Sequence, residues 1–220
     1  MEKNTDRSIS NDFIDASQIT RNVYLGSYEK GAKSYNGLKV LGITHNLIIG
    51  HIEQMPIPYP SEFIYKFIEL PDHHKANITD FFDECIEFLN TAISENPETH
   101  ILVDCFAGIS RSATIVIAYL IKNMCFNYLE AFETVRKARH WINPNKGFRE
   151  QLIKWSENFE RSNSENNIEE YDRARFLLKK MNEKGINFAE EMQILESFSN
   201  IFGEYHIHTI DIGEELLLRV

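Results

Sequence analysis

The chain has 220 residues, of which 43% are hydrophobic, and a formal net charge of -10. This apolar content is sufficient for a packed core and too high for a disordered chain. The negative charge argues against nucleic acid or an anionic membrane as the main partner, because both attract basic surfaces. Three cysteines, a polar N-terminus and the lack of a membrane-spanning apolar run predict a reducing compartment, the cytoplasm or the nucleus.

The first third of the chain predicts strands that alternate with short helices. Residues 1–17 are polar, and we expect them to form a flexible segment. Apolar and alternating patterns predict strands at 19–24, 43–49 and 63–70. A short helix around 28–34 is expected to end at Asn36-Gly37, and prolines make 50–61 a loop.

The next segment, residues 77–94, has the apolar spacing of an amphipathic helix, and Asn77 is a suitable N-cap. Cys85 belongs to the apolar stripe of this helix, and we therefore expect it in the core. The stripe consists of Ile78, Phe82, Cys85, Leu89 and Ala92.

The elements that follow complete an α/β pattern. A buried strand is predicted at 101–103 and a buried helix at 113–121. Asn127 and Glu130 have the spacing of a capping box, which starts a helix that runs to about residue 139. A turn at 143–145 precedes an amphipathic helix at 148–159. The pattern predicts a mainly parallel central sheet flanked by helices, with ligands at the carboxyl ends of its strands.

The C-terminal part has a different composition from the rest of the chain. Residues 161–172 are almost wholly polar and predict a linker after a domain at 18–160. Residues 173–220 form a small, mostly helical extension of unknown role. Because two short helices cannot bury their apolar stripes alone, we expect the extension to pack on the preceding domain or on a partner.

The chemistry is concentrated between strand 101–103 and helix 113–121. A loop of small residues between a strand and a helix N-terminus forms an anion cradle, with successive backbone N–H groups pointing inward. Cys105 opens the loop and Arg111 closes it. A thiolate is a strong nucleophile, and a guanidinium grips two oxygens of a phosphoryl group. The alternative, that Cys105 is one more buried small hydrophobe, leaves the spacing of Gly108, Ser110 and Arg111 to coincidence.

Residues 105–112 resemble the signature loop of the cysteine-dependent protein tyrosine phosphatases, and residues 106–114 are close to its atypical dual-specificity branch. The resemblance covers roughly residues 19–159. It implies a phosphatase-like fold and hydrolysis of phosphotyrosine and phosphoserine or phosphothreonine through a phosphocysteine on Cys105. Other landmarks occur in the expected order, namely Val23-Tyr24-Leu25-Gly26-Ser27, Leu41-Gly42-Ile43-Thr44-His45, Asp72 with Asn77-Ile78, and Ile142-Asn143-Pro144-Asn145 before Gly147-Phe148.

The resemblance also implies roles for individual residues. Asp72 corresponds to the general acid, and Ser112 to the hydroxyl that stabilises the departing thiolate. Asn145 resembles a residue that supports the phosphate loop. Arg139 either grips a second phosphate or, as we favour, is a solvated arginine at a helix end. Loop amides are expected to hold the phosphoryl oxygens; these belong to Phe106, Ala107, Gly108, Ile109, Ser110 and Arg111.

The resemblance further implies that the substrate is a phosphorylated protein. The reaction needs no metal and no cofactor. Residues 106–110 contain no lysine, whereas phosphoinositide phosphatases of this superfamily typically carry basic residues there. Inositol lipids are therefore disfavoured.

One residue departs from the family pattern. Asp104 stands where the family usually has histidine, and a carboxylate beside Cys105 opposes the thiolate. At an effective dielectric near 20, a charge roughly 6 Å away is worth ~2–3 kcal/mol. We expect Asp104 to be protonated and hydrogen-bonded to the loop backbone, which leaves a weakened but active phosphatase. The alternative is a pseudophosphatase-like module that only binds phosphopeptides.

Overall fold

The computed structural model describes residues 14–124 and 126–157. The predictions for 161–172 and 173–220, and for most of 1–17, lie outside this part. The strands are β1 (Ala16–Gln18), β2 (Val23–Ser27), β3 (Ile43–Gly50), β4 (Ile64–Glu69) and β5 (His100–Cys105). The helices are η1 (Tyr28–Ala32), α1 (Tyr35–Val40), η2 (Thr79–Phe81), α2 (Phe82–Glu95), α3 (Arg111–Met124) and α4 (Tyr128–Ala138), followed by a last helix at residues 146–157.

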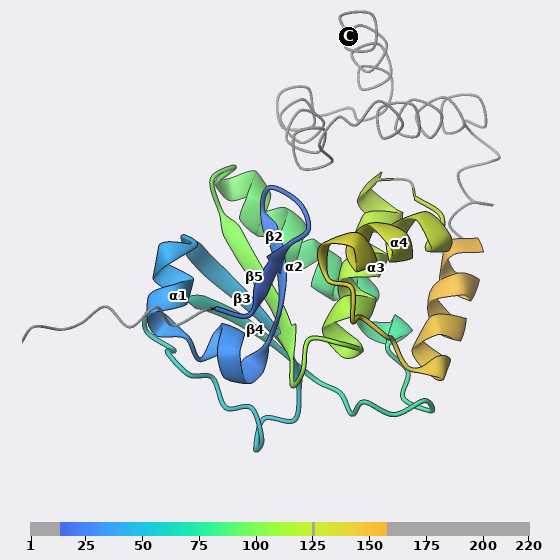
Figure 1. Cartoon of the computed structure of the whole chain (residues 1–220), viewed down its shortest axis with the longest axis horizontal. Helices are drawn as coiled ribbons and strands as arrows, with labels where there is room; N and C mark the ends of the chain where they lie inside the picture. Colours follow the sequence, from blue (N-terminus) through green and yellow to red (C-terminus); the bar gives the residue numbers. More distant parts are fainter. Residues whose placement is uncertain (1–13, 125, 158–220) are drawn as a thin grey trace, which may run out of the picture.

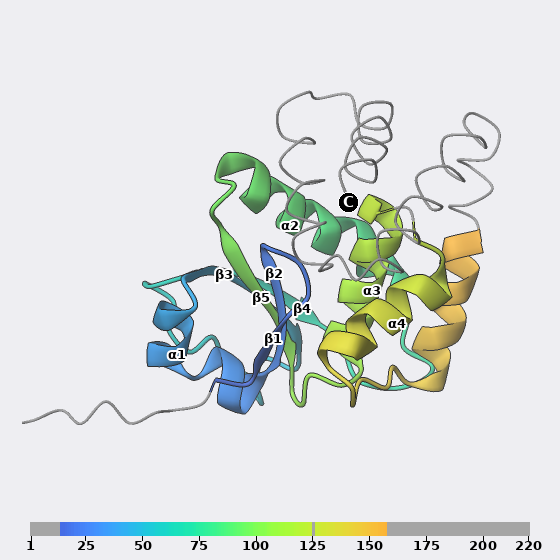
Figure 2. The same ribbon diagram turned by 45° about the horizontal axis from the view of Figure 1, so that its top comes forward.

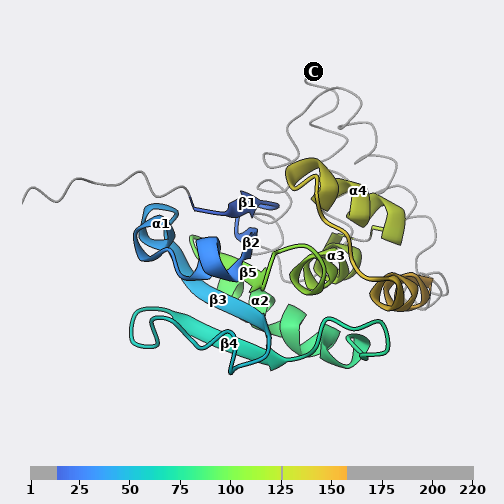
Figure 3. The ribbon, with the colours of Figure 1, turned by 60° about the horizontal axis from the view of Figure 1, so that its bottom comes forward.

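The strands form one five-stranded sheet in the order β1-β2-β5-β3-β4. Only β1 is antiparallel to its neighbour, while β2, β5, β3 and β4 run parallel. Helices α2, α3 and α4 cover one face of the sheet, and η1 with α1 covers the other (Figure 1 and Figure 3). The predicted mainly parallel sheet flanked by helices is confirmed.

The core is divided by the sheet into two apolar clusters. Side chains of a strand alternate between the faces, so Ile101 and Val103 of β5 join the cluster under the three long helices. Leu102 belongs to the smaller cluster under η1 and α1. Cys105 is the last residue of β5, the central strand of the sheet. Figure 2 shows β5 between β2 and β3. Within residues 14–124 and 126–157, none of the helices combines the length and the apolar character needed to cross a bilayer.

The first predicted strand, 19–24, is wrong in its position. Residues 19–22 form the connection between β1 and β2, and β1 lies partly in the segment that we expected to be flexible. The Thr20 hydroxyl explains the turn, because it accepts hydrogen bonds from the backbone N–H of Asn22 (3.3 Å) and of Val23 (3.1 Å). A threonine that binds nearby backbone competes with strand formation.

Two predicted helix boundaries also differ from the structure. Asn36-Gly37 lies inside α1 and does not end a helix. Gly37 is needed there for close packing, since an added Cβ would come within 2.7 Å of the Ile14 side chain. Asn77 is not an N-cap, because α2 begins at Phe82 after η2 and has no side-chain cap.

Candidate active site

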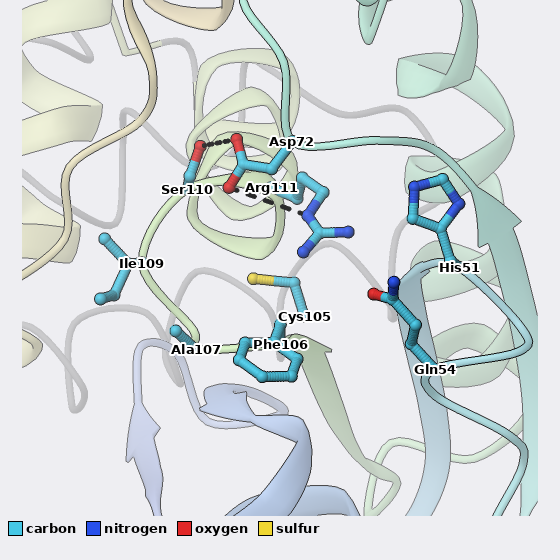
Figure 4. Close-up of a pocket in the computed structure, with 9 residues that line it drawn as sticks. All are labelled: His51, Gln54, Asp72, Cys105, Phe106, Ala107, Ile109, Ser110 and Arg111. Atoms are coloured by element: carbon cyan, nitrogen blue, oxygen red, sulfur yellow. Dashed lines mark hydrogen bonds and ion pairs between the residues drawn. The ribbon is translucent and has the colours of Figure 1, made fainter.

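The loop from β5 to α3 forms one wall of a cavity of about 380 Å³. Cys105 is the last residue of β5 and Arg111 the first of α3, and both side chains line the cavity, as their spacing predicts (Figure 4). Cys105 is 2% exposed, and the Ser112 hydroxyl donates a hydrogen bond to its sulfur over 3.2 Å. The lining residues are His51, Gln54, Asp72, Cys105, Phe106, Ala107, Ile109, Ser110 and Arg111.

The backbone of the loop is oriented by bonds to four successive carbonyls, those of residues 107–110. The carbonyls of Ala107 and Gly108 accept from Arg139, that of Ile109 from the Asn143 N–H, and that of Ser110 from Thr114. None of these three donors lines the cavity. Because the peptide bonds of the described residues are trans, the N–H groups of residues 108–111 point the opposite way, toward the cavity.

The Arg111 guanidinium is fixed at the edge of the cavity. The side chain is 8% exposed, and Nη1 donates to the Leu70 carbonyl over 3.1 Å. Its Nε lies 3.9 Å from the Asp72 carboxylate and has no hydrogen-bond partner among the described residues. Figure 4 shows the guanidinium beside the Cys105 sulfur. A buried donor in this position is suited to a phosphoryl oxygen.

Asp72 lies on the same side of the cavity as Ser110. Its Oδ1 accepts hydrogen bonds from the Ser110 hydroxyl and from the Asn145 amide, both over 2.8 Å. The carboxyl group is partly exposed to the cavity, with a side-chain exposure of 35%. The structure therefore brings Asp72, Ser110 and Asn145 together, although they come from three separate segments of the chain.

The last helix, residues 146–157, holds the loop that carries Asp72. Asn145 caps this helix by accepting the Phe148 N–H over 3.0 Å, so one side chain joins the helix to Asp72. An added Cβ at Gly147 would come within 1.9 Å of the His74 carbonyl, so only glycine permits this approach. Gln151 accepts the Ile78 N–H over 2.9 Å. The sequence gives no signal for the role of Gln151, because a polar residue in an amphipathic helix does not indicate its partner.

Arg139 is placed differently from the prediction. It is 1% exposed, lines no part of the cavity and lies behind the phosphate loop, so both predicted roles, a second phosphate contact and a solvated helix end, are wrong. Its Nη1 and Nη2 donate hydrogen bonds to Oδ1 and Oδ2 of Asp15, over 2.7 and 2.9 Å. Nothing in the polar segment around Asp15 signals this contact in the sequence.

Asp104 points away from Cys105, toward the face that η1 and α1 cover. In the register it lies between Gly26 of β2 and Ile48 of β3, and it is fully buried. Burial raises the pKa of the Asp104 carboxyl well above its ordinary value; neighbouring Cys105 adds to this, and the Asn46 side chain opposes it.

The predicted hydrogen bond from Asp104 to the loop backbone is wrong. Neither carboxyl oxygen has a hydrogen-bond partner among the described residues. The side-chain amide of Asn46 and the Tyr65 hydroxyl, which are also buried, likewise have none within this part of the chain. A charged carboxylate is costly in such surroundings, so the neutral acid is favoured.

His51 also lines the cavity, although its isolated position in the sequence did not indicate a site residue. Its Nδ1 lies 2.6 Å from Glu69 Oε1, and Glu69 Oε2 accepts the Ile52 N–H over 3.0 Å. Both hydrogen bonds lower the pKa of Glu69 below its usual value, and the bond from the Ile52 backbone has the larger effect. Figure 4 shows the other ring nitrogen of His51 on the side of Arg111. Among the described residues, no three His, Cys, Asp or Glu side chains form a group that could hold a metal ion.

Comparison with known proteins gives concordant results. Residues 23–158 match the family model "Dual specificity phosphatase, catalytic domain". Dual specificity protein phosphatase 1B of Arabidopsis thaliana is 41% identical over 138 residues, which cover 63% of this chain and 80% of that protein. Human dual specificity protein phosphatase 1 is 39% identical over 134 residues, which cover 60% of this chain but 35% of the human protein. The crystal structure of human tyrosine phosphatase-like serine/threonine/tyrosine-interacting protein is similar at a TM-score of 0.62 and 32% identity, covering 66% of this chain and 97% of that one.

Proposed function

The chain belongs to the dual specificity phosphatase family, and we propose that it hydrolyses phosphotyrosine and phosphoserine or phosphothreonine on proteins through a phosphocysteine on Cys105. The observation that carries this proposal is the Cys105 sulfur beside the Arg111 guanidinium and the Ser112 hydroxyl, under a loop whose amides face one cavity. We assign the catalytic domain to residues 18–160.

In the first step, the Cys105 thiolate attacks the phosphorus atom while the bond from phosphorus to the substrate oxygen breaks. Arg111 and the amides of residues 106–111 hold the three equatorial oxygens, where charge is concentrated in the transition state. Asp72 gives its proton to the leaving oxygen, so the substrate departs as a neutral alcohol or phenol. Ser110 and Asn145 orient the Asp72 carboxyl for this transfer.

In the second step, water attacks the phosphocysteine and the sulfur–phosphorus bond breaks. The Asp72 carboxylate accepts the proton of the water, which regenerates the acid for the next cycle. The Ser112 hydroxyl, 3.2 Å from the sulfur, donates to the thiolate as it leaves. Inorganic phosphate is the second product.

The cavity favours a phosphorylated side chain of a protein over an inositol lipid. Among the described residues, Arg111 is the only arginine or lysine that lines the cavity, so extra phosphates of a lipid headgroup would find no second permanent cation in this part of the chain. His51, held by Glu69, faces the same space and is our candidate for a contact with the substrate next to the phosphorylated residue. We place these substrates in the cytoplasm or nucleus.

A phosphopeptide-binding module is the second candidate function, and Asp104 is the observation that favours it. A carboxylate there would oppose the thiolate, but burial without a hydrogen-bond partner among the described residues raises the pKa of Asp104 and favours the neutral acid. The hydrogen bond from Ser112 to the Cys105 sulfur also favours an enzyme, because a protein that only binds phosphopeptides does not need a nucleophile. We therefore rank the enzyme first.

Turnover of an aryl phosphate by the wild type and by Cys105→Ser separates the two candidates. The enzyme proposal predicts steady phosphate release by the wild type, none by the variant, and phosphopeptide binding by both. If neither protein releases phosphate and both bind the phosphopeptide equally, the binding module is correct. The test uses the full chain, with inorganic phosphate release as the readout.

A further inference from the structure

An ion pair between a buried arginine and a partly exposed aspartate lies directly behind the phosphate loop. Arg139 follows α4 as its C-cap residue and is 1% exposed. Two of its nitrogens donate to the two oxygens of Asp15, over 2.7 and 2.9 Å. The Trp141 ring lies against the guanidinium, with its centroid 4.7 Å from Cζ. The pair is therefore bidentate, and the aromatic ring covers it.

The same guanidinium also binds the loop. Nε donates to the Gly108 carbonyl over 2.8 Å, and Nη2 donates to the Ala107 carbonyl over 3.3 Å. Gly108 has a φ of +65°, and an added Cβ would come within 2.6 Å of Arg139 Nη2 and 2.4 Å of the Gly26 carbonyl. The loop thus rests on Arg139 without space for any side chain between them.

Asp15 keeps this arginine in place. Burial alone would raise the pKa of Asp15, but hydrogen bonds from Arg139 and Ser27 outweigh it, so the pKa is lowered and the carboxylate stays charged. The Asp15 N–H also donates to the Lys30 carbonyl over 2.9 Å, which fixes the backbone beside β1. Because a guanidinium is planar and rigid, a carboxylate bound to one of its edges fixes the direction of the N–H groups on the other edge.

We propose that Asp15 and Arg139 are positioning residues for phosphoryl binding. By holding the carbonyls of Ala107 and Gly108 at the rear of the loop, Arg139 turns the N–H groups of Gly108 and Ile109 toward the phosphoryl group, because each peptide unit is planar. The guanidinium charge behind these carbonyls also polarises the two peptide groups, which strengthens their amides as donors. The inference rests on the proposed function and extends the working site to the segment before β1.

The test compares Arg139→Met with a matched control, Arg21→Met, in the full chain. Arg21 pairs with Glu98 near the other end of β2, away from the loop. Tungstate is the probe, because it binds as a tetrahedral anion and its binding needs no chemistry. At a temperature where all proteins are folded, Arg139→Met should weaken tungstate binding about tenfold and lower kcat on the order of 10²-fold. Arg21→Met should change neither by more than about twofold.

A charge swap separates positioning from simple tethering. Asp15→Arg combined with Arg139→Asp restores an ion pair, but a carboxylate at 139 cannot donate to the loop carbonyls. Positioning predicts that tungstate affinity stays low in the double variant, and recovery of affinity would overturn the inference. If neither variant folds, Asp15→Asn serves instead, with tungstate binding expected to weaken several-fold; unchanged affinity would overturn the inference. Should the wild type bind tungstate but release no phosphate, the proposed function fails while this inference is still tested.

Discussion

Two cysteines in the described part of the chain are equally buried, yet their surroundings differ. Cys85 is on the inner side of α2 among apolar side chains, and burial, assisted by Glu84, raises the pKa of its thiol to about 12. Cys105 ends β5 with the Ser112 hydroxyl 3.2 Å from its sulfur and Arg111 lining the same cavity. Burial alone therefore says little about reactivity, and the partners of the sulfur distinguish the two residues.

The largest expected effect comes from removing the Cys105 sulfur. Cys105→Ser should lower kcat for an aryl phosphate by at least about 10³-fold, because a serine hydroxyl in this site has no base to activate it. Phosphate release over time measures the loss. Cys85→Ala is the matched control and should keep kcat within about twofold; equal losses in both variants would erase the distinction between the two sites.

Asp72→Asn should have the next largest effect. The amide can accept the same hydrogen bonds but has no proton to give, so kcat should fall about 10²–10⁴-fold. The loss should be greater for phosphoserine peptides than for aryl phosphates, because an alkoxide needs protonation more than a phenoxide does. Steady-state rates on the two substrates, compared side by side, check this difference. A uniform loss on both would remove Asp72 from the acid role.

Ser112→Ala should act mainly on the second step. Without the hydroxyl the departing thiolate is less stable, so phosphocysteine should accumulate and the steady rate should fall about tenfold. A burst of the phenol product before a slow steady phase is the expected signature in rapid mixing. Loss of activity with no burst would assign Ser112 to the fold or to the first step.

Much of the site could be predicted from the sequence, because its chemistry is local. Cys105, Arg111 and Ser112 occupy one loop and one helix turn, and the capping box at Asn127 and Glu130 is confirmed in both of its bonds, at 3.0 and 3.1 Å. Such short-range contacts depend on spacing alone.

The contacts that were missed join residues far apart in the chain. Asp15 and Arg139 are separated by 124 positions, and Gln151 binds Ile78 across 73 positions. A polar residue carries no mark of such a partner in a single sequence. The misplaced first strand has a local cause, since Thr20 takes the backbone N–H groups that a strand would have used.

Asp104→Asn should change stability more than activity, and the difference should depend on pH. Because the pKa of Asp104 is raised, the folded protein keeps a proton that the unfolded chain releases above about pH 4. The wild type should therefore lose stability as the pH rises from that value toward the raised pKa, and the variant should lack this loss. Urea unfolding at several pH values measures this difference. If the free energy of unfolding changes with pH in the same way for both proteins, Asp104 is not held neutral.

The smallest predicted effect concerns Cys85, which lies in the apolar core. Cys85→Ala leaves a small cavity under α2, so it should reduce the free energy of unfolding by about 1 kcal/mol. Denaturant unfolding measures this change, and the kcat of the same preparation shows whether the active site is affected. A stability loss combined with a large loss of kcat would show that the two sites are coupled.

Acid-quenched turnover followed by peptide mapping of the covalent adduct tests the central claim most directly. With a phosphorylated substrate and the Ser112→Ala chain, in which the intermediate should accumulate, we expect one phosphate on the peptide that contains Cys105. Phosphate on a different residue, or sustained turnover with no adduct on Cys105, would contradict the account.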